Sequence, residues 1–360
     1  MNNERLAHVR ANLRRHGLSQ MLLVDPLSIW WLCGYYTEPY ERFLALYVPC
    51  DEAKEPVMFS NRLFPEVGDA CADVRTFDDT EDPIALVRDV TDRAAALGVD
   101  KKLAARWLVP LMEAGAATGF ALASDAIDDA RSTKDAHERE LMRAASAVND
   151  QAMDWLAGQI RPGVTERQIA DGLLGEYRRL GAQDHSFLPI VSFGDHGADP
   201  HHEPDDTVLK RGDVVLFDIG GRHRNYCSDM TRTFFWGEPD KETARIYDIV
   251  RRANEAAEAL IVPGVRMCDL DRAARDVIED AGYGQYFTHR LGHSIGLQDH
   301  EPGDVSLVNE QVVEPGMTFS IEPGIYLPGR TGVRIEDLAL VTESGVEILN
   351  AYPHDPVRLD

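Results

Sequence analysis

The sequence predicts an α/β domain over residues 1–130, followed by an α+β domain over residues 131–360 that carries a pseudo-twofold duplication. Three observations support this division. Helix-like and strand-like segments alternate through the first region, which is the pattern of an α/β domain. In the second region, a Pro-Gly-Val motif that opens a helix occurs twice. Each copy is followed by two strand-like segments around a turn, so the same pattern of helix and hairpin is present twice.

The first region is expected to begin with a helix over residues 4–16, where apolar residues recur at helical spacing. Further strands are predicted over residues 20–24, 29–33, 43–48, 58–60 and 74–77, and further helices over residues 83–97 and 107–117. The polar and aromatic stretch over residues 36–43 is expected to form a surface loop. A long helix should follow the domain boundary, with Ser132 or Thr133 as its N-cap.

The duplication is visible in two segments that lie 101 residues apart. IRPGVTERQIAD begins at Ile160, and IVPGVRMCDLDR begins at Ile261. Both open a helix with Pro-Gly-Val and place an apolar residue five positions after the valine. If a pseudo-twofold axis relates two such helix–helix–hairpin units, their hairpins can face each other across it.

The first hairpin carries two aspartates. Strands are predicted over residues 214–220 and 226–235, around a short polar turn at residues 221–225. Period-2 alternation places Asp218 on the same face as apolar residues, and Asp229 follows eleven residues later on the returning strand. Two partly buried carboxylates repel each other unless one is protonated or a cation lies between them. Ordinary aspartates at strand ends are the alternative interpretation.

The second hairpin carries two glutamates, which favours a bound cation over ordinary aspartates at strand ends. Its strands are predicted over residues 317–326 and 333–342, with Glu322 on one strand and Glu336 on the other. Between the two hairpins, His293 lies in the segment HRLGHSIGLQDHE. Two Asp, two Glu and one His form an oxygen-rich ligand set with one nitrogen. Such a set suits a pair of ions such as Mn, Co, Fe or Zn better than a cysteine-rich structural zinc site does.

Composition excludes several classes of partner. The chain of 360 residues has 37 basic and 61 acidic residues, a net charge of −24, which argues against nucleic acid or an anionic membrane as a partner. The five cysteines are scattered and lack CxxC spacing, so they predict neither a disulfide framework nor a thiolate site. The sequence shows no apolar signal core and no membrane span, so we expect a cytoplasmic protein.

The second region resembles the metal-dependent peptidases of the pita-bread fold, the group that contains Xaa-Pro dipeptidase (prolidase), aminopeptidase P and methionine aminopeptidase. The matching segments, in family order, are FLPIVSFGDHGADPHHEP, VVLFDIGGRHRNYCSDMTRTFF, HRLGHSIGLQDHE, FSIEPGIYLPG and GVRIEDLALVT. The first region, with LVDPLSIWWLCGY, resembles the N-terminal domain of the prolidase and aminopeptidase P branch. Methionine aminopeptidases typically lack that domain.

The resemblance implies a dinuclear metal site. Its ligands would be Asp218, Asp229, His293, Glu322 and Glu336. Asp218 would chelate one ion, Asp229 and Glu336 would bridge the two ions, and His293 would bind the other ion. Mn or Co is the expected metal, with Zn or Fe as alternatives.

The resemblance also implies catalytic and substrate-binding residues around the metals. Glu322 would take the proton of the bridging water, His201 would lie near the scissile bond, and His300 would contact the carbonyl oxygen or the tetrahedral intermediate. His289 would line the substrate pocket, and Arg334 would be tied either to the site or to the substrate carboxylate. His202 is expected to be a solvated neighbour of His201, and His185 and His196 are expected to be loop residues rather than ligands.

The implied function is hydrolysis of the bond before proline in short peptides, as in an Xaa-Pro dipeptidase, by a homodimer. An aminopeptidase P-type enzyme is the alternative within the peptidases. A non-peptidase hydrolase or lyase on the same fold and a binding protein with a degraded site are further alternatives. Creatinase-like hydrolases and the binding proteins have lost metal ligands, whereas all five positions are intact here. The metal-dependent lyases carry an extra acid close to the first aspartate, but Ile219 and Gly220 follow Asp218 in this chain.

Overall fold

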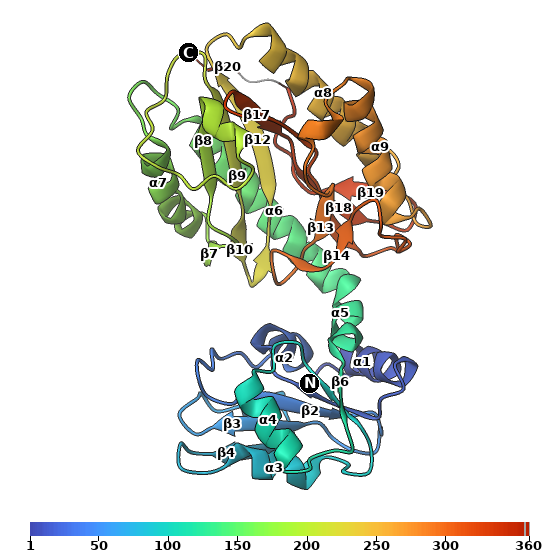
Figure 1. The fold of residues 1–360 in the computed structure, drawn as a ribbon. Helices are drawn as coiled ribbons and strands as arrows, with labels where there is room; N and C mark the ends of the chain where they lie inside the picture. Colours follow the sequence, from blue (N-terminus) through green and yellow to red (C-terminus); the bar gives the residue numbers. More distant parts are fainter. Residues whose placement is uncertain (356–357, 360) are drawn as a thin grey trace. The chain divides into compact units, whose positions relative to one another are not determined.

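The chain folds into two compact units, Met1–Arg131 and Ser132–Asp360, shown in Figure 1. This computed structural model describes residues 1–355 and 358–359. All five cysteines are free thiols. None of the helices in the described part of the chain has the length and apolarity that a membrane span requires.

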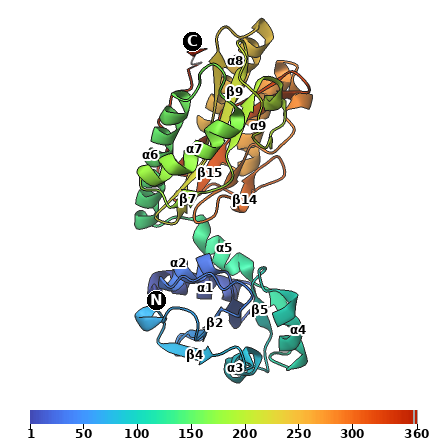
Figure 2. The ribbon, with the colours of Figure 1, turned by 90° about the vertical axis from the view of Figure 1, so that its left-hand side faces the viewer.

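The first unit contains one mixed six-stranded sheet in the order β4-β3-β2-β1-β5-β6, visible in Figure 2. Its strands are β1 (Gln20–Leu23), β2 (Ala45–Pro49), β3 (Val57–Asn61), β4 (Asp73–Phe77), β5 (Leu97–Val99) and β6 (Phe120–Leu122). Its helices are α1 (Asn3–Arg15), α2 (Pro26–Cys33), α3 (Pro83–Val90), α4 (Ala105–Glu113) and α5 (Ser124–Ser132). The predicted α/β class is confirmed, and most of the predicted elements are present.

The predicted strand over residues 29–33 is wrong, because this segment lies in helix α2. Asp25 caps the helix by accepting a hydrogen bond from the Ser28 N–H at 3.0 Å, and Pro26 occupies the first turn. Gly34 ends the helix in the left-handed conformation with φ of 78°. A short apolar run fits a helix or a strand equally well by periodicity, so the caps at its two ends decide.

The predicted helix over residues 83–97 is too long. Helix α3 ends at Val90, and the chain then enters β5, which was not predicted. Strand β6 was not predicted either. Both strands have only three residues, which is too short to show a period-2 pattern.

The second unit contains two copies of one arrangement of helices and strands. The first copy contains α6 (Ala136–Ala157), α7 (Glu166–Arg179), β7 (Asp184–His185), β8 (Ile190–Phe193), β9 (Val214–Ile219), β10 (Gly221–His223), β11 (Tyr226–Cys227) and β12 (Met230–Trp236). The second contains α8 (Lys241–Glu258), α9 (Met267–Asp280), β13 (Gly292–Ser294), β14 (Glu301–Val305), β15 (Thr318–Ile321), β16 (Gly324–Leu327), β17 (Thr331–Arg334), β18 (Asp337–Val341) and β19 (Val346–Ile348). Strand β20 (Arg358–Leu359) pairs with β12.

The N-cap of α6 is Asp135, not Ser132 or Thr133 as predicted. The Asp135 carboxylate accepts from the Glu138 N–H at 2.9 Å, and the Glu138 side chain accepts from the Asp135 N–H at 2.9 Å. This capping box satisfies two N–H groups that the first helical turn leaves unpaired. It explains why the helix begins two or three residues later than predicted.

The duplication predicted from the sequence is confirmed in the packing. The apolar faces of α6 and α7 cover β8, β9 and β12, whereas those of α8 and α9 cover strands of the second copy. Figures 1 and 2 show the two helix pairs on opposite sides of these strands. Equivalent asparagines also make equivalent contacts: Asn149 on α6 donates to the Ile219 carbonyl at 2.9 Å, and Asn254 on α8 donates to the Ile321 carbonyl at 3.0 Å.

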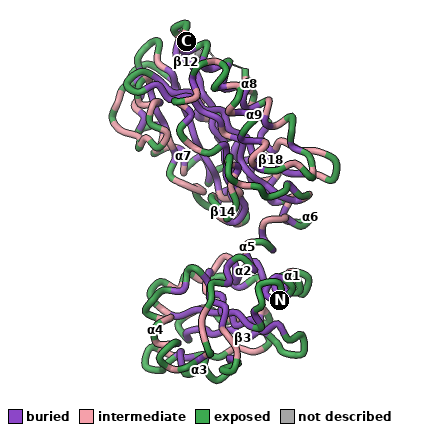
Figure 3. Tube along the Cα trace, turned by 45° about the vertical axis from the view of Figure 1, so that its right-hand side comes forward, coloured by how far each residue is buried: buried purple, intermediate pink, exposed green. Residues whose placement is uncertain are grey.

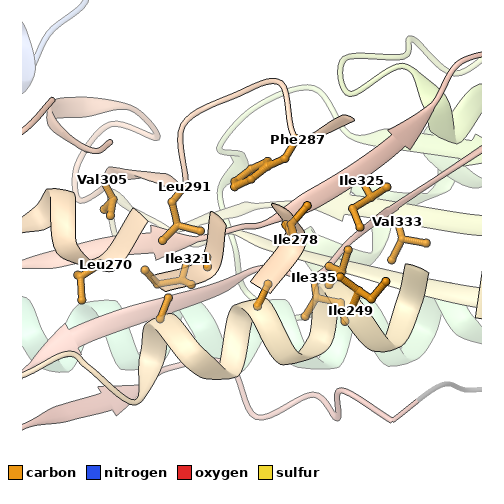
Figure 4. Packing of buried hydrophobic residues seen from close by; sticks show 14 of the residues in the cluster. Ile249, Leu270, Ile278, Phe287, Leu291, Val305, Ile321, Ile325, Val333 and Ile335 are labelled. Carbon is orange, nitrogen blue, oxygen red and sulfur yellow. The ribbon is translucent and has the colours of Figure 1, made fainter. Parts of the chain in front are cut away.

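The strands between the helix pairs form the buried interior of the second unit, as Figure 3 shows. In the second copy, Ile249 and Ile278 from the helices meet Ile321 and Ile325 from the strands (Figure 4). Burying an aliphatic side chain of this size contributes about 1.5–3 kcal/mol relative to leaving it exposed. This packing fixes the strands that carry Glu322 and Glu336.

A buried network of ion pairs surrounds Asp337, the first residue of β18. Arg232 donates to the Asp337 carboxylate at 2.7 Å and to the Glu336 carbonyl at 2.7 Å. His354 lies 2.5 Å from the other Asp337 oxygen. Burial and the nearby Asp337 raise the pKa of Glu258, at the end of α8, to about 8. The folded chain therefore holds a proton on Glu258 that an unfolded carboxyl, with a pKa of about 4.3, releases.

We predict that Glu258→Gln removes a pH dependence of stability. Below the unfolded pKa of about 4.3, Glu258 is neutral in both the folded and the unfolded state, so wild type and variant should be similarly stable. As pH rises from the unfolded pKa to about 8, unfolding of the wild type releases the Glu258 proton, so its stability falls, whereas the amide of the variant stays neutral. Urea unfolding at pH 5 and pH 9 measures the difference, with Glu255→Gln on the exposed side of α8 as the control. Parallel profiles for wild type and Glu258→Gln would contradict this assignment.

Candidate functional site

Three of the four predicted acidic residues lie where the two hairpins break, and the fourth, Asp218, lies in the ladder just before a break. In the first hairpin, β9 pairs with β12. Strands β10 and β11, which lie between them in the chain, join β7 in a different sheet. The predicted turn over residues 221–225 is therefore largely strand, and the turn itself is Arg224 and Asn225 with φ of 49° and 73°. Asp218 lies at the end of β9, and Asp229 lies in the break between β11 and β12.

The second hairpin breaks in the same way. Strands β15 and β18 belong to a five-stranded sheet, and β16 and β17 form a separate pair. Glu322 lies in the break between β15 and β16, and Glu336 lies between β17 and β18. Pro323 contributes to this break because it has no N–H to donate to a ladder. Gly220 has the matching role in the first hairpin, since a Cβ there would lie 2.0 Å from the Ser186 hydroxyl.

Contacts between the hairpins hold the carboxylates together. The Thr231 hydroxyl donates to the Glu336 carboxylate at 2.8 Å, and the Glu336 N–H donates to the Thr231 carbonyl at 3.1 Å. The Thr233 hydroxyl donates to the Arg334 carbonyl at 2.8 Å. Thr231 was not assigned a role from the sequence, although it lies two residues after Asp229. These contacts join β12 to the segment that carries Glu336.

The carboxylates form a dense anionic cluster. Asp229, His293 and Glu336 have ligand atoms within 4.8 Å of one another, and all three residues are buried. Burial and the nearby Glu336 raise the pKa of Asp229 well above its usual value, while burial and Glu322 do the same for Glu336. One oxygen each of Asp218 and Asp229 is buried without a hydrogen-bond partner. Multivalent cations would satisfy both the charge and these oxygens.

His293 presents one ring nitrogen to the acids. Its Nδ1 lies 3.2 Å from the Ser294 carbonyl, which can only accept a hydrogen bond, so Nδ1 carries the proton. The lone pair of Nε2 then faces Asp229 Oδ2 at 3.5 Å and Glu322 Oε1 at 3.7 Å. A backbone carbonyl that fixes the tautomer in this way is typical of a metal-binding histidine.

Arg334 is bound to the acidic cluster. It is 2% exposed and donates to Asp218 at 2.6 Å, to the Thr231 hydroxyl at 3.0 Å and to the Tyr326 hydroxyl at 2.8 Å. The Tyr326 hydroxyl in turn lies 2.8 Å from His289 Nε2. Of the two roles weighed for Arg334, this geometry favours the one that orients the site. Tyr326, in β16, was not assigned a role from the sequence.

His300 and His201 are the accessible histidines of the predicted set. The His300 ring stacks on the His293 ring at a centroid distance of 3.7 Å, and its side chain is 60% exposed. Arg290 donates to His300 Nδ1 at 3.1 Å, so the neutral ring carries its proton on Nε2. Burial and the nearby His293 lower the pKa of His300 to about 4. His300 is therefore a neutral hydrogen-bond donor at neutral pH.

All ten of these polar residues line one cavity of about 1200 Å³. They are Asp218, Asp229, His293, Glu322, Glu336, Arg334, His201, His289, His300 and Arg290. The cavity is large enough for a short peptide. It also contains Asp299, a further acid that was missed because it precedes His300 in a loop with no periodic pattern.

His196 and His202, which the sequence did not link to any other group, both contact Glu166. His196 Nδ1 lies 3.0 Å from one oxygen of Glu166, and His202 Nε2 lies 2.7 Å from the other. The Glu166 side chain is fully buried. No local sequence pattern indicates this contact, because Glu166 lies 30 residues before His196.

Comparisons with known proteins agree with the geometry. The family profile described as metallopeptidase family M24 matches residues 140–343, and the creatinase/prolidase N-terminal domain profile matches residues 5–133. An uncharacterized peptidase of Staphylococcus epidermidis is 38% identical over 97% of this chain and 99% of its own length.

Two solved structures match almost the whole chain. The crystal structure of a dipeptidase from Pyrococcus horikoshii has 32% identity and a TM-score of 0.93, covering 99% of this chain and all of that one. A prolidase from Thermococcus sibiricus has 29% identity and a TM-score of 0.93, covering 100% of this chain and 99% of that one. The pita-bread fold expected from the sequence is confirmed.

We predict that Arg334→Met destabilises the metal-free protein by about 3–5 kcal/mol, the usual effect of removing one partner of a buried ion pair. The substitution keeps the length of the side chain but leaves Asp218 charged and unpaired. Urea unfolding in the presence of a chelator measures the loss. Arg330→Met is the control, because Arg330 is 54% exposed at the tip of the same hairpin. A loss in Arg334→Met no larger than in the control would show that the ion pair does not hold the site.

Proposed function

Since the chain belongs to metallopeptidase family M24, we propose that it is a dipeptidase that hydrolyses the bond before proline with two divalent metal ions. The observation that carries the proposal is the convergence of four carboxylates and one imidazole on one wall of a peptide-sized cavity. Mn or Co is the proposed metal, with Zn or Fe as alternatives.

The residues present fit a pair of ions. The ligands would be Asp218, Asp229, His293, Glu322 and Glu336. One buried oxygen of Asp218 and one of Asp229 have no hydrogen-bond partner, and His293 Nε2 is unprotonated. When bound, two such ions acidify a shared water molecule and polarise the carbonyl of the scissile bond. An oxygen-rich set with one imidazole suits Mn or Co, and the cysteines take no part in it.

The chain's own groups would move protons and stabilise charge. The Glu322 side chain is 18% exposed, compared with 5% for Asp229 and 12% for Asp218, so it can best exchange a proton with the cavity. The Nε2–H of neutral His300 is a donor for a developing oxyanion. His201 is exposed to the cavity and would contact the peptide near the scissile bond.

A cation on the cavity wall would pair with the substrate carboxylate. Arg334 is committed to Asp218, and His289 is held neutral because burial and the nearby Arg334 lower its pKa to about 4. Arg290 is 39% exposed, and its nearest carboxylate, Asp304, is 3.7 Å away. We assign the carboxylate to Arg290, whereas His289 would contribute its ring to the cavity wall. A charge-assisted hydrogen bond of this kind distinguishes a dipeptide from a longer peptide.

A dipeptidase without a requirement for proline is the second candidate. The P. horikoshii structure that is described as a dipeptidase is at least as similar to this chain as the prolidase structure. An aminopeptidase P-type activity would require room in the cavity for the substrate residues that follow the proline. The rates on Ala-Pro, Ala-Ala and Ala-Pro-Ala separate these three activities.

A homodimer is part of the proposal. Tyr36 and Tyr40 are 50% and 77% exposed in the first unit, and Leu188 is 83% exposed in the second. Exposed large apolar side chains of this kind are suited to contacts with another chain. Light scattering should give twice the 40.1 kDa mass of the chain.

We predict that Glu322→Gln abolishes turnover and that His300→Ala lowers kcat by roughly 10²-fold, the scale of losing one oxyanion donor. His137→Ala, on the exposed face of α6, is the control and should keep wild-type kcat. Metal content is measured in parallel, so that loss of metal in Glu322→Gln is recognised. A near-normal kcat in metal-loaded His300→Ala would remove His300 from the reaction.

We also predict that Arg290→Ala raises KM for Ala-Pro on the order of 10-fold or more, from the loss of one charged hydrogen bond. The KM for Ala-Pro-Ala should change less, because its carboxylate lies one residue further from the scissile bond. Arg330→Ala, which lies outside the cavity lining, should leave both constants unchanged. An equal rise on both substrates would show that Arg290 does not read the dipeptide carboxylate.

A further inference from the structure

A second group of metal-ligand residues lies outside the peptidase centre. Glu166, His196, His202 and Asp205 each offer one ligand atom, and these four atoms lie within 4.8 Å of one another. No residue of this group, which we call the loop cluster, belongs to the proposed peptidase centre. We propose that the loop cluster binds a divalent transition-metal ion such as Zn²⁺ or Co²⁺.

Glu166 is the fixed part of the cluster. It is the first residue of α7, and its side chain is 0% exposed. One oxygen accepts from the Phe193 N–H at 2.7 Å, and the other accepts from the Asp205 N–H at 3.1 Å. The two oxygens therefore have fixed directions before any ion binds, which lowers the cost of binding.

The two histidines point at this carboxylate from one side. Their rings lie 4.3 Å apart, with His196 Nδ1 at 3.0 Å and His202 Nε2 at 2.7 Å from Glu166. Ligands about 2.0–2.1 Å from a tetrahedral Zn²⁺ lie roughly 3.3 Å from one another. In this structure both nitrogens donate to the Glu166 carboxylate, so an ion would replace their protons. A small outward movement of the rings, whose side chains are 29% and 13% exposed, would make room for the ion.

Asp205 supplies the second carboxylate of the cluster. It offers a ligand atom within 4.8 Å of that of Glu166. Two imidazoles and two carboxylates form a set that zinc and cobalt prefer, and with a divalent ion the group is neutral.

The loop that carries the cluster also carries His201. Residues 194–198 contact β17 so closely that a Cβ on Gly332 would lie 1.7 Å from the Gly197 carbonyl. The Pro200 carbonyl lies 3.5 Å from Arg334 Nη1. An ion bound by His196 and His202 would therefore fix the backbone of His201 beside the peptidase cavity, and His202 itself lines that cavity.

The test measures how much metal binds to a variant whose peptidase centre has lost two of its ligands. Chelated Asp229→Asn/Glu336→Gln protein is dialysed against Co²⁺, and bound cobalt is measured by mass spectrometry and by its visible absorption. About one ion per chain is expected to remain, with the absorption of imidazole-bound cobalt. Adding His202→Gln should remove this ion and its absorption, although the glutamine amide can still donate to Glu166. Adding His137→Ala should leave both readouts unchanged.

Asp205→Asn provides a second variant in case His202→Gln unfolds, which circular dichroism would reveal. Its amide oxygen can still accept from the Thr207 N–H, which lies 2.7 Å from Asp205 Oδ1, but it lacks the negative charge. Cobalt affinity should fall at least 10-fold. Equal cobalt binding with and without these substitutions would overturn the proposal and leave the loop cluster as a hydrogen-bonded brace. The absence of cobalt from the parent protein would overturn it as well.

Discussion

The structure of the second unit depends on keeping four carboxylates together in a buried place. Repulsion and burial both oppose this arrangement, as the raised pKa values of Asp229 and Glu336 show. Arg334 supplies one compensating charge through its 2.6 Å contact with Asp218. One arginine does not balance four acids, so the remaining repulsion is relieved either by protons, which the raised pKa values of Asp229 and Glu336 favour, or by bound cations.

The duplicated fold positions the acids by breaking both hairpins at equivalent places. Each break releases a short piece of backbone from its ladder, and Asp229, Glu322 and Glu336 lie in these pieces. Asn149 and Asn254 hold the carbonyls of Ile219 and Ile321, the residues next to Asp218 and Glu322. The helices thus fix the breaks from outside, and Thr231 joins them from inside.

Much of this arrangement could be predicted because it leaves local signals in the sequence. The repeated Pro-Gly-Val motif indicated the duplication, and alternating strands indicated the acids. Part of helix α2 was mistaken for a strand because the apolar run of five residues at 29–33 is too short to show a distinctive period. The roles of Tyr326 and Thr231 and the contact of Glu166 with His196 and His202 depend on distances between separate segments. Periodicity and spacing carry no information about such contacts.

The central claim is that two ions are held by Asp218, Asp229, His293, Glu322 and Glu336. Anomalous diffraction from a crystal soaked in Mn²⁺ tests it most directly, because it locates each ion without reference to activity. The account predicts two strong peaks in the cavity, each within about 2.0–2.6 Å of oxygens from these residues, the range of divalent metal–oxygen distances. Peaks that avoid these five side chains, or one peak where two are required, would contradict it.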